Sequence, residues 1–227
     1  MPDLSFRIGE VKAMPYTVVP TIAARLHIVN VPNDEKIQSV LLNCQMQVRP
    51  LGRAYSPMEE ARLLDLFGER ELWGRTMKPL HWTNLVLKVP PFTGETTIDL
   101  PLPCSLDFDV AANKYFYGLE AGSIALAAMF SGTVFYSGEH SSMQIAQIPW
   151  DREACFQLPV DVWKQAIDAH YPGSAWLRLP RETFDRLYRY KVGRGIPMWE
   201  GVMNRLLDQA ERAEVAGELA SAEGAGR

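Results

Sequence analysis

Hydrophobic and polar residues alternate over most of the first two thirds of the chain, and this alternation predicts β-strands. In the stretch 37–48, apolar residues stand at every second position: Val40, Leu42, Cys44, Met46 and Val48. The positions between them carry mainly Ser, Asn and Gln. A period of two is typical of a sheet with one buried and one solvated face. Similar runs, separated by short turns, occur at 4–8, 22–31, 82–89, 96–100, 106–110 and 143–148.

The stretch 122–136, GSIALAAMFSGTVFY, is the most apolar part of the chain. A transmembrane helix needs about 20 apolar residues. This stretch is shorter, and it contains Ser131, Gly132 and Thr133. Its aromatic and β-branched residues, placed between glycines, predict a strand that is covered on both faces.

Helical patterns interrupt the strands once and dominate the end of the chain. Near 57–67, Ser56 and Glu59 match a capping box, Pro57 suits the first helical position, and Gly68 suits the end. Apolar residues recur at helical spacing around 160–171, around 180–192 and from 196 onward.

Together these patterns predict an α+β chain, in which an antiparallel β-sandwich of roughly eight to nine strands is followed by a helical C-terminal segment. The sandwich is expected over 1–158, with one inserted helix near 57–67. Residues 159–214 are expected to form a helical segment packed on the sandwich. The Ala/Gly/Glu-rich residues 215–227 are expected to be a flexible tail.

Composition and charge narrow the class of protein further. The chain has 227 residues, 47% of them hydrophobic, and six tryptophans, which indicates a packed globular protein. The net charge of -4 gives no overall electrostatic reason to expect nucleic acid or an anionic membrane as a partner. The first residues lack the basic start and apolar core of a secretory signal, so we expect a cytoplasmic protein without a membrane span.

No motif for a cofactor or for catalysis is present. The sequence lacks the phosphate-binding, dinucleotide-binding and zinc-protease patterns and the nucleophile elbow. Cys44, Cys104 and Cys155 are widely spaced, which suits free thiols in a reducing compartment. The four histidines show no local metal-binding spacing. We therefore expect no bound cofactor and assign no catalytic residue.

One pair of carboxylates is a weak candidate for a metal or acid–base site. Asp107 and Asp109 alternate with apolar residues in LDFDV, so on a strand their side chains would lie on one side, about 6 to 7 Å apart. Such a pair could bind a divalent cation or transfer protons. The same alternation is also explained by the solvated face of a half-buried strand.

A basic segment near the C-terminus is the candidate for binding a partner. Its cationic residues are Arg178, Arg181, Arg186, Arg189, Lys191 and Arg194. Tyr188 and Tyr190 lie among them, and the only acids are Glu182 and Asp185. Such a segment could dock on an acidic protein or stack on nucleic acid, or it could be a solvated helix face.

The chain resembles a bacterial family of conserved proteins of unknown function. The resemblance runs to about residue 207, through blocks such as YSPMEEARLLDLFGE, WGRTMKPLHWT, FSGTVFY and IPMWEGVMNRLL. Genes of that family tend to lie beside those for actinobacterial-type, high-affinity [NiFe] uptake hydrogenases. The resemblance therefore implies an accessory or assembly factor for such an enzyme, with hydrogenase subunits or maturation proteins as partners.

We expect, on these grounds, a non-catalytic binding or accessory protein that assists the assembly or stability of a [NiFe] hydrogenase. One alternative is an enzyme or metal-binding protein that uses the Asp107/Asp109 face. Another is a chaperone-like module that holds a client on exposed apolar surface. The oligomeric state is left open.

Overall fold

The computed structural model describes residues 1–105, 107, 110–138, 142–174 and 177–224. The chain forms two compact units, Met1–Trp176 and Leu177–Arg227.

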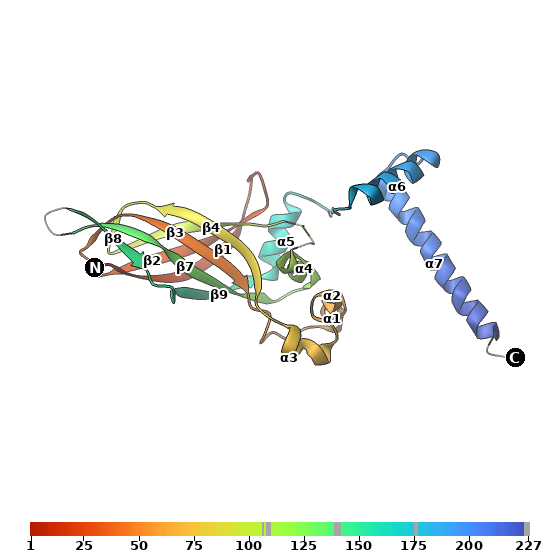
Figure 1. Ribbon diagram of the computed structural model, residues 1–227, viewed down its shortest axis with the longest axis horizontal. Helices are drawn as coiled ribbons and strands as arrows, with labels where there is room; N and C mark the ends of the chain where they lie inside the picture. Colours follow the sequence, from red (N-terminus) through yellow and green to blue (C-terminus); the bar gives the residue numbers. More distant parts are fainter. Residues whose placement is uncertain (106, 108–109, 139–141, 175–176, 225–227) are drawn as a thin grey trace. The chain divides into compact units, whose positions relative to one another are not determined.

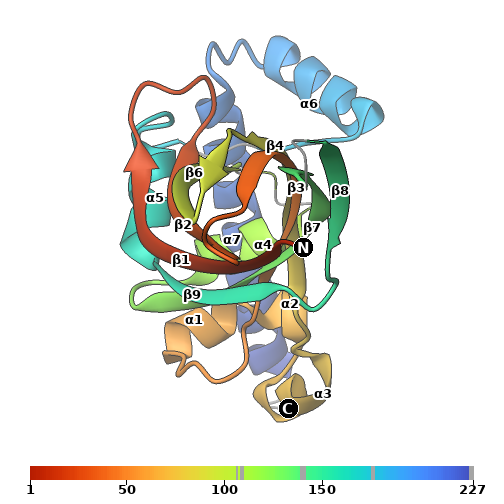
Figure 2. The same ribbon diagram turned by 90° about the vertical axis from the view of Figure 1, so that its left-hand side faces the viewer.

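The first unit is built on two antiparallel sheets. The smaller sheet has the order β1-β2-β6, formed by β1 (Asp3–Met14), β2 (Thr21–Val31) and β6 (Glu95–Pro103). The larger sheet has the order β4-β3-β7-β8, formed by β4 (Leu80–Val89), β3 (Lys36–Val48), β7 (Ser123–Ser137) and β8 (Met143–Ile148). Two further strands pair with its inner strands: β5 (Phe92–Thr93) pairs with β3 beyond the part that β4 pairs with, and β9 (Glu153–Pro159) pairs with β7 beyond the part that β8 pairs with. Figure 2 looks along the two sheets and shows them facing each other. The predicted α+β fold with an antiparallel sandwich is confirmed.

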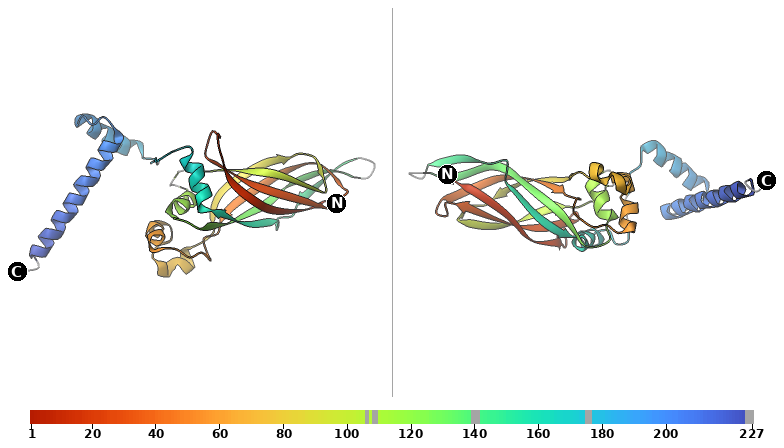
Figure 3. Two further views of the ribbon diagram at one scale, coloured as in Figure 1. Left: turned by 180° about the vertical axis from the view of Figure 1, so that it is seen from behind. Right: turned by 90° about the horizontal axis from the view of Figure 1, so that it is seen from below.

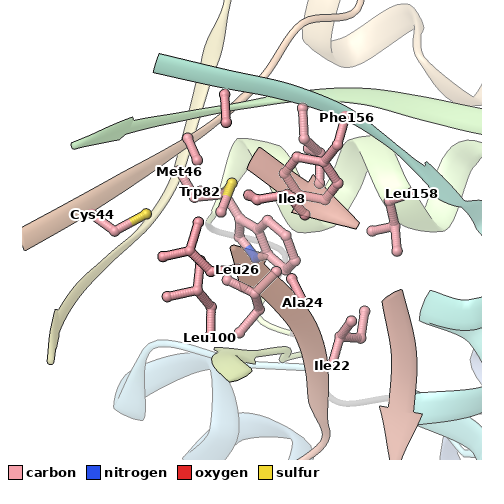
Figure 4. Close-up of a cluster of buried hydrophobic side chains, with 14 of the residues drawn as sticks. Ile8, Ile22, Ala24, Leu26, Cys44, Met46, Trp82, Leu100, Phe156 and Leu158 are labelled. Atoms are coloured by element: carbon pink, nitrogen blue, oxygen red, sulfur yellow. The ribbon is translucent and has the colours of Figure 1, made fainter. Parts of the chain in front are cut away.

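The core lies between the sheets and consists of the apolar side of each alternating strand. The five apolar residues predicted for 37–48 are each at most 1% exposed. Figure 4 shows Cys44 and Met46 of β3 pointing toward Trp82 of β4 and toward Leu26 and Leu100 of the smaller sheet. Phe6 of β1 stacks on Phe130 of β7, with ring centroids 4.3 Å apart. Burial of these side chains is the main force that holds the sheets together.

The most apolar stretch of the sequence forms strand β7, but this strand is not covered on both faces as predicted. Only one of its faces is fully buried, through Ile124, Leu126, Ala128, Phe130, Val134 and Tyr136. On the other face Ser131 is exposed and Met129 is partly exposed. The strand is apolar because it lies in the middle of the larger sheet, where small or apolar residues suit both sides.

Short helices lie together at one end of the sandwich (Figure 1 and Figure 3). They are α1 (Pro57–Arg62), α2 (Leu64–Phe67), the 3-10 helix η1 (Arg70–Leu72), α3 (Trp73–Thr76), α4 (Ala111–Gly118) and α5 (Val160–Asp168). The predicted capping box is present, because Ser56 Oγ accepts the Glu59 backbone N–H and Glu59 accepts the Ser56 backbone N–H. The single helix expected near 57–67 is interrupted at the buried Leu63, which ends α1 and begins α2.

The strand expected at 106–110 is not formed by the described residues there. Strand β6 ends at Pro103, and Val110 already caps α4. The Asn113 side chain donates hydrogen bonds to Ser105 Oγ at 2.8 Å and to the Asp107 carbonyl at 3.1 Å. Such local bonds give the backbone an alternative to a sheet ladder.

Helix α5 belongs to the first unit and packs against β1, β2 and β9. Val160, Trp163 and Ala166 form its buried side. The second unit contains α6 (Arg181–Gly193) and α7 (Trp199–Gly224). Helix α7 includes residues 215–224 of the expected tail, whereas 225–227 lie outside the described residues.

Candidate partner-binding surface

Only Asp107 of the carboxylate pair suggested by the sequence belongs to the described residues. Asp107 lies in the loop between β6 and α4, where its backbone N–H faces Ser105 Oγ at 3.4 Å. Asp109 lies outside the described residues. Within the described part of the chain, no group of three or more His, Cys, Asp or Glu side chains could hold a metal ion.

The three cysteines occupy different environments. Burial raises the pKa of the Cys44 and Cys104 thiols to about 12. Cys155 is exposed on β9. Its Sγ donates to Glu153 Oε1 at 3.0 Å, and this hydrogen bond raises the pKa of the thiol.

These environments predict how the folded protein reacts with a thiol reagent such as DTNB. Only Cys155 is expected to react in the native state, and all three thiols in denaturant, because burial disfavours the thiolate of Cys44 and Cys104 and keeps the reagent away from their sulfur atoms. Glu153→Ala should speed native labelling, since it removes the acceptor while Arg49 Nη1 stays 3.4 Å from the sulfur. Fast native labelling of Cys44 or Cys104 would contradict the described core.

The second unit carries a cluster of aromatic side chains on its surface. Phe184 and Tyr188 lie one helical turn apart on α6, and Trp199 at the start of α7 closes the group. The ring centroids of Phe184 and Trp199 are 5.3 Å apart, and those of Tyr188 and Trp199 are 6.5 Å apart. The Lys191 ammonium lies 5.8 Å from the Trp199 ring. All three rings are exposed by more than a third of their surface, even though they touch one another.

The basic residues predicted from the sequence lie on α6 or close beside it. Arg181, Arg186, Arg189 and Lys191 lie on α6, Arg194 directly follows it, and Arg178 precedes it. The Arg194 guanidinium lies 5.3 Å from the Tyr190 ring. Among the residues that the structure describes, Arg181, Arg186 and Arg189 have no ion pair. Exposed guanidinium groups without carboxylate partners are available to an incoming anionic group.

The second unit has almost no core of its own. Val202 is the one buried residue within its described part. Large apolar side chains remain exposed instead: Leu177, Phe184, Tyr188, Val192, Met198, Trp199, Leu207 and Val215. A groove of about 510 Å³ opens between Leu177, Leu179, Arg181, Phe184 and Asp185. Two helices that bury so little gain little stability from each other, because helices in proteins are stabilised mainly by packing.

The aromatic cluster is the part of this surface that the sequence did not predict. The helical spacing of Phe184 and Tyr188 shows that they share a side of α6. The contact with Trp199 depends on the turn between the helices, which places Trp199 beside residues 11 and 15 positions earlier. The signal that could have predicted this contact is the position of Trp199, which begins a helix directly after a turn that contains Gly and Pro.

None of the helices in the described ranges is both long enough and apolar enough to cross a membrane. No curated protein matches the chain.

Two solved structures are similar at low sequence identity. A late embryogenesis abundant (LEA) protein is 10% identical, with a TM-score of 0.33, over 70% of this chain and 71% of its own. The ApaA protein from Bordetella pertussis is 14% identical, with a TM-score of 0.23, over 69% of this chain and 93% of its own. At these TM-scores, neither likeness carries an argument about this protein.

One family model spans both units. It matches residues 1–215, which include the whole sandwich, the basic helix α6 and most of α7. The chain therefore belongs to the Family of unknown function (DUF6084).

Proposed function

We propose that this chain is a non-catalytic binding protein whose second unit docks on an acidic surface of a protein partner. The observation that carries the proposal is the exposed cluster of Phe184, Tyr188 and Trp199, together with the arginines without carboxylate partners that α6 also carries.

The residue types suit a protein interface. Trp, Tyr and Arg are enriched among the residues that dominate binding energy in known interfaces, and such residues cluster near the centre of the contact. Arg186 and Arg189 would add charge complementarity, which speeds association and selects acidic partners. A unit that buries only Val202 among its described residues would also gain stability when a partner covers its apolar side chains.

We further propose that the partner is a subunit or a maturation protein of a [NiFe] hydrogenase, and that the chain acts in the cytoplasm as an accessory factor. This step follows from the resemblance described above. The exposed aromatic and basic surface supports it, since an assembly factor needs a face that can hold a partner. Deleting the gene should then lower hydrogenase activity or maturation, whereas unchanged hydrogenase would refute this choice of partner.

Affinity purification of the tagged chain from the native bacterium tests the docking surface. Arg186→Glu combined with Arg189→Glu should reduce recovery of the main partner about tenfold or more, because like charges would then face each other across the interface. Raising the salt concentration should weaken the wild-type contact in the same direction, since salt screens exposed charges. Mass spectrometry of the eluates measures both effects.

The matched control is Arg75→Glu combined with Lys78→Glu. These two residues are also basic and exposed, and their reversal changes the net charge equally. This variant should keep the partner. Equal loss in both variants would show a general charge effect and would contradict docking through α6. Recovery of many unrelated unfolded proteins would favour the chaperone-like alternative.

A further inference from the structure

The outer face of the larger sheet carries a groove of about 460 Å³ in the first unit. Three adjacent strands line it, with β3 in the centre, β4 on one side and β7 on the other. The strand register arranges the outward side chains in two rows. The first row is Val86, Asn43 and Ser131, and the second is Asn84, Gln45 and Met129. The rows are about 7 Å apart, and the three strands span about 10 Å.

The polar side chains of the groove are neutral and unengaged. Asn43, Gln45 and Asn84 each present an amide with both donors and an acceptor. All three are exposed, and no hydrogen bond joins their amides, or the Ser131 hydroxyl, to another described residue. None of the residues that line the groove is charged.

Polar side chains beside the groove, unlike those within it, bond to other side chains of the protein. Farther along β7, Thr133 and Gln147 bond to each other at 3.3 to 3.4 Å. At the opposite end, Arg49 and Glu153 form an ion pair at 2.7 Å. The polar groups on either side are thus satisfied within the protein, whereas those in the groove are free to bind a ligand.

An exposed tryptophan completes the groove. Trp150, in the turn between β8 and β9, is 92% exposed and lines the groove with Met129 and Val86. An indole in water leaves a large apolar surface uncovered. The face of its ring is electron-rich and attracts weakly positive C–H groups.

We propose that this groove binds a neutral saccharide. A sugar ring has an apolar face of C–H groups, which would pack on Trp150, and hydroxyl groups around its edge. Each hydroxyl both donates and accepts a hydrogen bond, as do the side-chain amides of Asn43, Gln45 and Asn84. The absence of charge among the lining residues selects against phosphorylated, nucleic-acid and other ionic ligands.

Binding of the full-length chain to an array of neutral and acidic oligosaccharides tests this inference, followed by titration with the best neutral sugar. Trp150→Ala should weaken binding about tenfold or more, since stacking on an aromatic ring is lost. Asn43→Ala should weaken it similarly, because the sugar hydroxyls would lose a hydrogen-bond partner in the groove. Both side chains are exposed, so the variants should keep the thermal stability of the wild type.

Tyr16→Asn is the matched control. Tyr16 is a fully exposed aromatic residue outside the groove, with φ of 60°, and Asn tolerates this conformation. The control should bind the sugar as the wild type does. The Arg186→Glu/Arg189→Glu variant should also bind the sugar as the wild type does. Sugar binding therefore tests the groove separately from the proposed partner surface.

Three results would overturn the proposal. The first is that no neutral saccharide binds, even at millimolar concentration. The second is that one binds but with equal affinity in Trp150→Ala and Asn43→Ala. The third is that only acidic glycans bind, through the arginines of α6. A protein partner that is lost on Trp150→Ala, without any sugar binding, would assign the groove to a protein instead.

Discussion

Gly132→Ala is expected to lower the free energy of unfolding by about 3 kcal/mol or more, or to prevent folding altogether. Gly132 has φ of 142°, a conformation that residues with a side chain rarely adopt. A Cβ atom there would lie 2.1 Å from the Leu41 carbonyl oxygen and 3.2 Å from the Leu42 Cα. Both are backbone atoms of β3, and β8 pairs with β7 on its other side. The strand therefore cannot shift to relieve the clash without breaking a ladder.

Urea unfolding followed by tryptophan fluorescence measures this effect, together with the yield of folded protein. Gly74→Ala in α3 is the control, because a Cβ atom there meets nothing within 4 Å. That variant should be neutral or slightly more stable, since Ala favours a helix more than Gly does. Gly52→Ala isolates the conformational cost, as it has positive φ but open space. Its expected cost is about 1 kcal/mol. A Gly132→Ala protein that unfolds like the wild type would contradict the close approach of Gly132 to the β3 backbone.

Glu59→Ala is expected to cost about 3–5 kcal/mol, because it removes one partner of a buried ion pair and leaves the other charge uncompensated. Glu59 is 3% exposed. Its carboxylate accepts hydrogen bonds from Arg53 Nη2 at 2.5 Å and from the Glu120 and Ser56 backbone N–H groups at 2.8 and 3.0 Å. Arg53 in turn donates to the Ser123 and Ala121 carbonyl groups. One carboxylate thus joins α1 to the segment that leads into β7.

The neighbouring Glu60 is the matched control. Its ion pair with Arg70 has the same chemistry, with a 2.7 Å contact, but both partners are at least a third exposed. Glu60→Ala should therefore cost less than about 1 kcal/mol. Similar losses for both variants, measured by urea unfolding at neutral pH, would contradict the structural role of the Arg53–Glu59 pair.

The same carboxylate should make stability depend on pH. Burial alone would raise the pKa of Glu59, but the backbone N–H groups of Glu120 and Ser56 and the charge of Arg53 outweigh it and lower the pKa below the usual 4.5. A lowered pKa in the folded state means that the stabilisation is present at neutral pH and is lost as the pH falls through the folded-state value. The stability difference between wild type and Glu59→Gln should therefore shrink in acid below pH 4.5. A constant difference over that range would rule out this linkage.

Local patterns were sufficient for much of the fold. The alternation of residues 37–48 identified β3 and its buried side, because side chains of a strand point to opposite faces in turn. Ser56 and Glu59 identified the start of α1, because a capping box involves residues only three apart. The same alternation misled at Asp107 and Val110, the described residues of the strand expected at 106–110, because bonds from Asn113 hold Ser105 and Asp107 in a loop.

The candidate surfaces were predicted less completely than the fold. The sequence by itself determined the basic helix, whose arginines lie within one segment, and the sandwich, whose strands carry their own period of two. Only the tertiary structure decided that Glu59 bonds to Glu120, that Trp199 contacts Phe184, and that Asn43, Asn84 and Ser131 line one groove. These contacts join residues that are distant along the chain, so they depend on how strands pair and how the chain turns, and no local pattern records that.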